Sequence, residues 1–460
     1  MRPTRWRQST HVAVGVVVLA LVAAVVAVAA VVAGQRSSAA EAVGPAPAPA
    51  TADPGVIPVD MSAPSPTVGG LAAALAPVLA NPDLGTLTGR ITDADTGAEI
   101  WAQRADLPMQ PASVNKVLTT AAALLTLDRD ATLTTTVLAV ESQPGLVVLK
   151  GGGDTTLSAA PAGTDTWYKG AARISDLAEQ VRASGVRVTA VRVDTSAYRG
   201  PTMAPGWDPA DIEGGDIAPI ESVMLDGGRI QPTTVESRRS RTPALDAGRA
   251  LAAALQVDPQ AVTVLPAAVA GTRQIAAVQS APLIERLRQM MNASDNVMAE
   301  SIAREVAAEL NEEQSFAGGV EAVLGQLERV GIDTSAARLV DASGLSVEDR
   351  LTAAILDDVV TLAAGHTAPA LRPLVDLLPV AGGSGTLSNR YLDTAAGRDA
   401  AGWLRAKTGS LTGTNALAGI VTDDNGRVMT FALISNNAGP TGRTAIDAVA
   451  AVLRSCGCGT

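Results

Sequence analysis

The stretch PASVNKVLTTAAALLTL, residues 111–127, sets the class of the fold, because its apolar residues recur with a helical period and predict a buried helix. Ser113 and Lys116 share one face of that helix, so the lysine amine can reach the serine hydroxyl. A serine hydroxyl is a poor nucleophile until a base takes its proton, and Lys116 is the available base. The ordinary interpretation is a capping serine followed by a lysine that extends to solvent. Lysine is scarce in the chain, with residues at positions 116, 150, 169 and 407.

Two further motifs follow this pair along the chain. In ASDNVMAE, the run Ser294–Asn296 stands at the start of a predicted helix, where it could also be a plain capping cluster. In LRAKTGSLTG, the run Lys407–Gly409 stands just before or on a predicted strand, where it could also be an ordinary turn at a strand edge. The order S-x-x-K, S-D-N, K-T-G rarely arises by chance, and two of the four lysines fall within it.

Composition excludes several classes of function. The formal net charge of −11 over 460 residues argues against a nucleic-acid partner, which requires a basic surface. The chain has two histidines, His11 and His366, so a zinc site of several histidines is excluded, and we expect neither metal nor cofactor. A Ser-His-Asp esterase would have to rely on His366 alone, and this remains an alternative hypothesis.

The N-terminus predicts an extracytoplasmic protein. Residues 1–10 form a basic tail, and residues 11–34 contain an uncharged apolar run that is long enough to span a bilayer. The arginines of the tail should stay in the cytoplasm and send the rest of the chain outside. The segment 11–34 is either a transmembrane signal-anchor or a cleaved signal peptide. Residues 35–66, rich in alanine and proline, are typical of an extended linker.

The remainder of the chain predicts one domain interrupted by another. A predicted hairpin at about 87–104 precedes the Ser113 helix, and a second hairpin, turned at Asn425-Gly426, precedes a final amphipathic helix. Short β-like runs with one helical segment lie between these parts. We therefore expect a catalytic domain from residues 67–138 and 281–455, an inserted β-rich domain at 139–280, and a tail at 456–460. Cys456 and Cys458 in that tail form either a strained disulfide or two free thiols.

The three ordered motifs resemble those of serine-type penicillin-binding proteins and β-lactamases. More narrowly, the chain resembles the class C low-molecular-mass penicillin-binding proteins, the D-alanyl-D-alanine carboxypeptidase/endopeptidase family. The resemblance covers roughly residues 67 to 455 and includes VLKGGGDTTLS, IAPIESVMLDGGRI and LVDASGLSVEDRLT. It implies an α/β (α+β) penicillin-binding/serine β-lactamase-like domain, an antiparallel sheet flanked by helices.

The spacing of the motifs is also similar to that of this family. About 180 residues separate Lys116 from Ser294, and in the family a largely β domain fills this gap. A class A β-lactamase would need a deacylating glutamate, but the nearest match, AAELN, has Ala307 in its place. β-Lactamase activity is therefore disfavoured as the main function. The chain also departs from the family in one place, because the segment after DASGLS lacks the family's usual arginine and asparagine.

The resemblance implies acyl transfer on a peptidoglycan stem peptide, and the chemistry of the residues assigns the first roles in it. Ser113 would attack the carbonyl of the penultimate D-Ala with Lys116 as base, Ser294 would pass a proton to the leaving amine, and Asn296 would hold the substrate amide and Lys116. Lys407 would lower nearby pKa values. The backbone N–H of Ser113 would stabilise the oxyanion.

The family resemblance implies further roles on the K-T-G strand. Lys407 and Thr408 would hold the terminal carboxylate of the substrate, with Gly409 in the substrate-binding strand. The backbone N–H of Ser410 would complete the oxyanion site. β-Lactam antibiotics would act as covalent inhibitors. The balance of carboxypeptidase and endopeptidase activity, the third stem residue and the oligomeric state stay open. A catalytically weak wall-binding or scaffolding protein of the same fold is the alternative.

Overall fold

The computed structural model describes residues 20–28, 31 and 62–456, and the chain divides into two compact units, residues 1–58 and 59–460. In the first unit, residues 20–28 are helical, and apolar side chains such as Leu21 and Val25 are exposed. The expected basic tail, most of the 11–34 segment and nearly all of the linker lie outside the described residues. Within the described part of the chain, no helix combines the length and the hydrophobicity that a membrane crossing needs.

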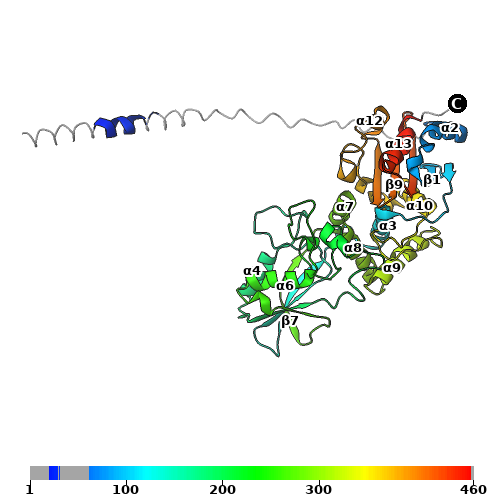
Figure 1. The fold of residues 1–460 in the computed structure, drawn as a ribbon. Helices are drawn as coiled ribbons and strands as arrows, with labels where there is room; N and C mark the ends of the chain where they lie inside the picture. Colours follow the sequence, from blue (N-terminus) through cyan, green and yellow to red (C-terminus); the bar gives the residue numbers. More distant parts are fainter. Residues whose placement is uncertain (1–19, 29–30, 32–61, 457–460) are drawn as a thin grey trace, which may run out of the picture. The chain divides into compact units, whose positions relative to one another are not determined.

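The second unit is built around a five-stranded antiparallel sheet in the order β2-β1-β10-β9-β8 (Figure 1). Both expected hairpins are present: β1 pairs with β2, and β9 pairs with β10. The central strand comes from the end of the chain, and β8 is an edge strand. The bounds are β1 Thr86–Asp93, β2 Glu99–Gln103, β8 Leu404–Leu411, β9 Thr414–Thr422 and β10 Val428–Asn436.

Helices cover both faces of this sheet, which explains its nearly continuous burial. Alternate residues of β9 enter different cores: Leu417 joins the core beneath α2 and α13, whereas Ala416 and Ala418 join the core beneath α3 and α10. This alternation follows from the two-residue period of a strand. The small alanines let α3 and α10 pack closely on that face. The helices concerned are α2 Val68–Leu79, α3 Lys116–Thr126, α10 Ala353–Ala364, α12 Ala395–Ala400 and α13 Gly442–Ser455.

A helical cluster extends the core around α3, which is the predicted buried helix. Nine of its eleven residues are buried, including Lys116. Helices α8 and α9 pack against α3 and against each other, and α7 ends where α8 begins. The cluster therefore brings the S-x-x-K and S-D-N segments together. Its bounds are α7 Leu283–Ala293, α8 Asn296–Glu309, α9 Phe316–Arg329 and α11 Pro373–Leu377.

The inserted segment forms a second five-stranded sheet in the order β6-β5-β4-β3-β7, with α4 and α6 packed on it. The sheet is mixed, because β4, β5 and β6 run parallel whereas β3 pairs antiparallel with β4 and β7. Its bounds are β3 Thr134–Val140, β4 Leu146–Lys150, β5 Ala190–Asp194, β6 Thr263–Leu265 and β7 Thr272–Gln279, with α4 Ile174–Ala183, α5 Ala210–Gly214 and α6 Pro243–Ala254.

Two details of the insert differ from the sequence analysis. Strand β3 begins at Thr134 and belongs to the second sheet, so this sheet starts before the expected boundary at residue 139. The sequence predicts one helix in this segment, α4, whereas the structure also contains the short α5 and α6, which begins at Pro243 and continues through an alanine-rich run. Because a proline at the first helical position and alanine both favour a helix, the signal was present.

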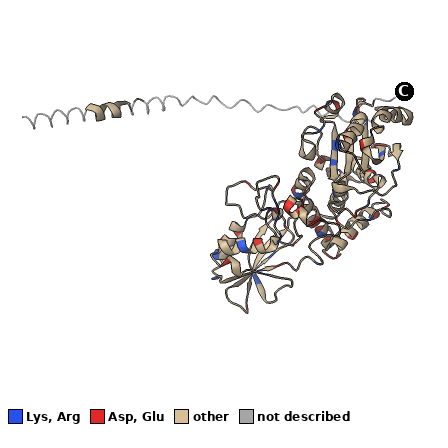
Figure 2. Ribbon diagram, in the orientation of Figure 1, with Lys and Arg blue, Asp and Glu red and all other residues tan. Residues whose placement is uncertain are grey.

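Two further features of residues 62–456 are the distribution of their charged side chains and the cysteine at their C-terminal end. Acidic and basic residues are interspersed over the elements of both sheets (Figure 2). Cys456 is buried and disulfide-bonded, which resolves the choice between disulfide and free thiol for this residue. Cys458 lies outside the described residues.

Candidate active site

Ser113 and Lys116 lie at the N-terminal end of α3. Ser113 is on a short 3-10 turn, Ala112–Asn115, which leads into the helix at Lys116. The lysine side chain is completely buried, so the ordinary interpretation of a lysine that extends to solvent is wrong. Its Nζ lies 2.9 Å from Ser113 Oγ, 2.6 Å from Asn296 Oδ1 and 2.7 Å from the Ser343 carbonyl oxygen. The predicted contact between amine and hydroxyl is therefore present.

The environment of Lys116 prepares it to lose a proton. Burial lowers its pKa from 10.5 to about 8. The negative charges of Asp341 and Glu300, and to a smaller extent those of Asp295 and Asp349, act against this shift. An ammonium ion is costly to bury, and these carboxylates offset only part of that cost. The amine is thus partly neutral near pH 8. A neutral amine is the form that can accept the proton of a serine.

The DASGLS segment, which sequence reasoning linked only to the family resemblance, supplies the Ser343 carbonyl. Asp341 accepts hydrogen bonds from the backbone N–H groups of Ser343, Gly344 and Ser346 and from Trp207 Nε1. Glu300 on α8 accepts from the N–H groups of Ala342 and Ser343 at 3.0 and 2.9 Å. These bonds fix the turn and aim the Ser343 carbonyl at Lys116. No side-chain motif could have predicted a backbone acceptor.

The S-D-N motif joins α7 to α8. Ser294 ends α7 in the left-handed conformation, with φ of +56°, and Asp295 caps α8 by accepting from the Met298 N–H. The expected helix start is therefore confirmed. Ser294 Oγ accepts from Lys407 Nζ at 2.9 Å, while Asn296 begins α8 and faces Lys116. One motif thus contacts both buried lysines.

The K-T-G residues lie on the edge strand β8. Lys407 is completely buried, and its amine also donates to the Thr408 carbonyl at 2.8 Å. Burial places the pKa of Lys407 well below its ordinary value, and the positive charges of Lys116 and Arg390 act in the same direction. Gly409 has a steric role: a Cβ there would lie 2.7 Å from the Pro111 carbonyl oxygen and 3.2 Å from the Ser113 nitrogen. Glycine therefore lets β8 pass directly beside the nucleophile.

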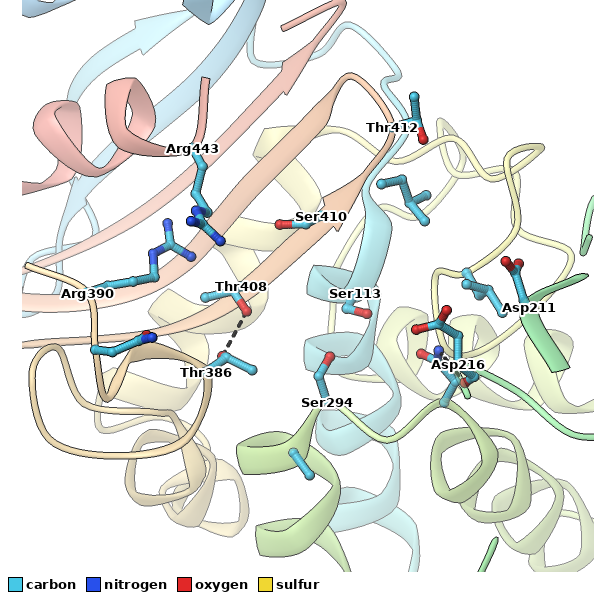
Figure 3. Close-up of a pocket in the computed structure, with 15 residues that line it drawn as sticks. Ser113, Asp211, Asp216, Ser294, Thr386, Arg390, Thr408, Ser410, Thr412 and Arg443 are labelled. Atoms are coloured by element: carbon cyan, nitrogen blue, oxygen red, sulfur yellow. Dashed lines mark hydrogen bonds between the residues drawn. The ribbon is translucent and has the colours of Figure 1, made fainter. Parts of the chain in front are cut away.

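These segments enclose a cavity of about 610 Å³. Ser113, Ser294, Thr408 and Ser410 all reach its wall (Figure 3). Lys116, Asn115, Lys407 and Gly409 do not line it. The full lining comprises Ser113, Asp211, Asp216, Ala293, Ser294, Asn296, Leu345, Thr386, Asn389, Arg390, Thr408, Ser410, Leu411, Thr412 and Arg443.

Sequence reasoning missed the charged ends of this cavity. Arg390 and Arg443 lie at the end beside Thr408, and Asp211 and Asp216 lie at the opposite end (Figure 3). Arg390 is held by Asp447, with Nε 2.9 Å from Oδ2. Arg443, at the start of α13, is exposed. These residues stand singly in the sequence and belong to no motif, so only the fold brings them together.

The structure does not support the alternative hypothesis of an esterase that relies on His366. His366 is exposed just after α10 and lines a separate hollow with residues of α10 and of the turn between β1 and β2. It does not line the cavity that contains Ser113. A Ser113–His366 pair is therefore not formed, and the Ser-His-Asp hypothesis lacks its geometry.

Comparisons with known proteins agree with this geometry. The D-Ala-D-Ala carboxypeptidase 3 (S13) family matches residues 71–239 and 233–455, and the Carboxypeptidase Rv3627c-like, N-terminal domain matches residues 1–58. The chain is 81% identical over 459 residues to carboxypeptidase DacB of Mycolicibacterium smegmatis, with 100% of both chains covered. It is 64% identical over 462 residues to carboxypeptidase Rv3627c of Mycobacterium tuberculosis, again with 100% of both covered.

A solved structure shares the fold. Penicillin-binding protein 4 of Haemophilus influenzae, also solved in complex with a novel β-lactam, superposes with a TM-score of 0.66 at 22% identity. The match covers 83% of this chain and 97% of that one. The likeness therefore includes the inserted segment as well as the sheet that carries the motifs. Family model, relatives and fold agree: the chain belongs to the D-Ala-D-Ala carboxypeptidase 3 (S13) family of serine peptidases, the low-molecular-mass penicillin-binding proteins that its motif order indicated.

Proposed function

We propose that the protein is a D-alanyl-D-alanine carboxypeptidase that removes the terminal D-Ala of peptidoglycan stem peptides through an acyl-enzyme on Ser113. The observation that carries the proposal is the position of the Lys116 amine, 2.9 Å from a serine hydroxyl that lines a cavity. The opposite walls of that cavity come from the S-D-N and K-T-G segments.

Acylation follows from the hydrogen bonds of Lys116. A neutral amine has two N–H groups, and two carbonyl-type acceptors, Asn296 Oδ1 and the Ser343 oxygen, are in place for them. Its lone pair then points to the Ser113 hydroxyl and takes the proton as Oγ attacks the substrate carbonyl. The acceptors therefore orient the base as well as hold it.

The leaving amine needs a proton before the C–N bond breaks. Ser294 Oγ reaches the cavity and is hydrogen-bonded to Lys407 Nζ, so it can give its proton to the amine and recover one through Lys407. In this arrangement Lys407 acts through Ser294, since the lysine is buried behind the wall. The terminal carboxylate of the substrate would instead meet Thr408 and Ser410, with the exposed guanidinium of Arg443 nearby.

The oxyanion would form beside two backbone N–H groups, those of Ser113 and Ser410. Each such donor typically contributes about 3–4 kcal/mol to the stability of the transition state. Strand β8 is the edge of its sheet, and residues 379–381 pair with its outer edge at Leu404 and Ala406, so the part from Thr408 to Leu411 is the one that an extended substrate would meet. An extended stem peptide along β8 would place its scissile carbonyl between the two donors.

Water completes the reaction by hydrolysing the acyl-enzyme. The same intermediate forms when the leaving group is an amine of a cross-linked stem, so endopeptidase activity is part of the proposal. β-Lactams would acylate Ser113 by the same attack, with the β-lactam nitrogen as leaving group. The alternative, a wall-binding or scaffolding protein, would bind stem peptides without cleaving them.

The test of the function is mass spectrometry of the full-length protein after incubation with defined pentapeptide and cross-linked muropeptides. We expect release of free D-Ala and, after trapping with penicillin, an adduct on the peptide that contains Ser113. A folded protein that binds muropeptides yet releases neither D-Ala nor a stem fragment would support the scaffolding alternative.

The pH dependence of acylation should report the Lys116 amine. Because its pKa is about 8, the rate constant for acylation should fall about tenfold for each pH unit below 8 and level off above it. Burial also raises the pKa of Glu300 to about 7, so this group titrates nearby. Glu300→Gln should retain the limb but move it below pH 8, because the Glu300 charge raises the pKa of Lys116; the rate is measured with a fluorescent penicillin by stopped flow. A rate that is flat from pH 6 to pH 9 would contradict Lys116 as the base.

We also propose that the protein acts outside the cytoplasm, held to the membrane by the segment 11–34 or released after its cleavage. The uncharged run after the arginine-rich tail and the exposed apolar side chains of residues 20–28 support this placement. Membrane fractionation of the full chain tests it. An anchored protein requires detergent for release, a cleaved one is found in the medium, and recovery in the cytosol would refute the proposal.

A further inference from the structure

Three groups of the inserted segment contact the S-D-N motif. Tyr168 Oη donates to Asp295 Oδ2 at 2.6 Å, and Arg239 Nη2 lies 3.8 Å from the same oxygen. The carbonyl of Asp216 accepts from Asn296 Nδ2 at 2.9 Å. The insert therefore holds the side chain of Asn296 and also that of Asp295, the middle residue of the motif, which has no role in the proposed chemistry.

This contact is buried and charged. Asp295 is 4% exposed, Tyr168 1% and Arg239 3%. A carboxylate so deeply buried requires partners, and its second oxygen is already used to cap α8 at the Met298 N–H. Although burial opposes it, Arg239, the Tyr168 hydroxyl and this N–H keep the pKa of Asp295 below its ordinary value. The ionised form is thus fixed in place by the insert.

Arg239 also fixes the segment that carries Asp216. Its Nε donates to the Gly215 carbonyl at 2.9 Å, and its backbone N–H donates to the Ile212 carbonyl at 2.9 Å. Gly227, with φ of +62°, leaves room for the pair, because a Cβ there would lie 2.3 Å from Tyr168 Oη and 2.8 Å from Arg239 Nη1. The insert is therefore shaped around these two side chains.

Asp295 stands between two side chains of the proposed mechanism. Ser294 precedes it in a left-handed conformation that non-glycine residues rarely adopt and that persists only when neighbours hold it. Asn296 follows it and contacts Lys116. A rotation of Asp295 would move Ser294 Oγ away from Lys407 and Asn296 Oδ1 away from the base. A misplacement of about 1 Å can lower a rate by about 10²-fold.

We propose that Tyr168 and Arg239 are positioning residues, which act through Asp295 to hold Ser294 and Asn296 in the geometry for acyl transfer. Neither lines the cavity, so neither touches the substrate. The inference rests on the proposed function of the site. It makes the insert a part of the catalytic machinery, because the second domain determines whether the proton donor to the leaving group is aligned.

The test is Tyr168→Phe in the full-length protein, which removes one hydroxyl and keeps the ring. Two substrates with the same acyl group are compared: a D-Ala-D-Ala peptide and a thioester analogue. An amine must be protonated to leave, whereas a thiolate leaves without a proton. We expect kcat for the peptide to fall about 10- to 100-fold and kcat for the thioester to fall several-fold less, because a displaced Asn296 affects the base for both substrates whereas a displaced Ser294 affects only the peptide.

A matched control is Tyr198→Phe, since Tyr198 also comes from the insert and its hydroxyl lies 3.1 Å from Ser301 Oγ, further along α8. It should leave both rates at the wild-type level. Arg239→Lys should retain more peptide hydrolysis than Arg239→Met, because it keeps a charge near Asp295. An equal loss on both substrates, or no loss, in Tyr168→Phe would overturn the proposal. A wild-type protein that cleaves neither substrate would refute the proposed function itself and this inference with it.

Discussion

Replacing Ser113 with alanine will abolish both D-Ala release and covalent labelling by penicillin, with a fall in kcat of about 10⁵- to 10⁶-fold. The Ser113 hydroxyl is the one that Lys116 contacts, whereas the nearby Ser294 hydroxyl accepts from Lys407. The cavity contains no second serine paired with Lys116, among the residues that the structure describes. The measurement is gel fluorescence with a fluorescent penicillin, together with D-Ala release from a pentapeptide.

Ser410→Ala provides the matched control. Ser410 also lines the cavity, and its proposed contributions are a backbone N–H, which alanine retains, and one contact to the terminal carboxylate of the substrate, which alanine weakens. We expect its loss of activity to be less than about tenfold. Labelling of Ser113→Ala at the wild-type level would overturn the assignment of the nucleophile, whatever the outcome for Ser410→Ala.

Lys116→Met should lower the rate of acylation by about 10³- to 10⁴-fold, because it removes the base and keeps much of the buried volume. Its former partners, Asn296 Oδ1 and the Ser343 carbonyl, would lose a donor, which costs about 1–3 kcal/mol per buried group. The fall should therefore be measured beside the midpoint of thermal unfolding. Labelling kinetics and melting curves together separate lost chemistry from lost stability.

Lys150→Met, a change of the same type on β4 of the insert, should acylate at the wild-type rate. The esterase alternative makes the opposite prediction for the pair Lys116 and His366. It requires His366→Ala to remove activity and Lys116→Ala to spare much of it. Activity that survives in Lys116→Met and disappears in His366→Ala would show that the lysine is not the base.

Much of the site could be predicted from the sequence because its chemistry demands particular residue types at fixed spacing. A serine can be activated by a lysine one helical turn away, and that pair is recognisable in SVNK. The hairpin turn at Asn425-Gly426 was equally readable, since Gly426 adopts the positive φ that such turns require. Long gaps between motifs indicated an insert. These signals are local, so they can be recognised in the sequence without knowledge of the fold.

The rest depends on contacts between distant segments. The Ser343 carbonyl is an acceptor that every residue possesses, so only the turn held by Asp341 and Glu300 makes it special. Arg443 lines the cavity because α13 packs beside β9, a contact that no spacing encodes. One weak signal pointed to Tyr168: the chain contains only three tyrosines, and a rare aromatic residue between predicted strands is a candidate for a specific contact. Its partner Asp295 lies 127 residues away.

The expected roles on the K-T-G strand also required the fold. Sequence reasoning assigned Lys407 partly to the substrate carboxylate, but burial places its amine against Ser294 and the Thr408 carbonyl. Gly409 was expected among the substrate-binding residues, and a Cβ there would lie closest to the Pro111 carbonyl oxygen and the Ala112 Cβ. Whether a side chain faces a substrate or the protein interior depends on what packs on its face of the strand. The motif alone does not contain that information.

The place of β10 in the sheet has a consequence for biosynthesis. This strand is the middle one, and it contacts β1 across 346 residues of chain, as in the hydrogen bond from Thr88 Oγ1 to the Ile434 carbonyl. Contacts so distant in sequence form late, because a long loop must close first. A growing polypeptide thus contains Ser113 long before the catalytic site can form. We expect hydrolase activity only after β10 has paired with β1, so the incomplete chain should not cleave peptidoglycan during its synthesis.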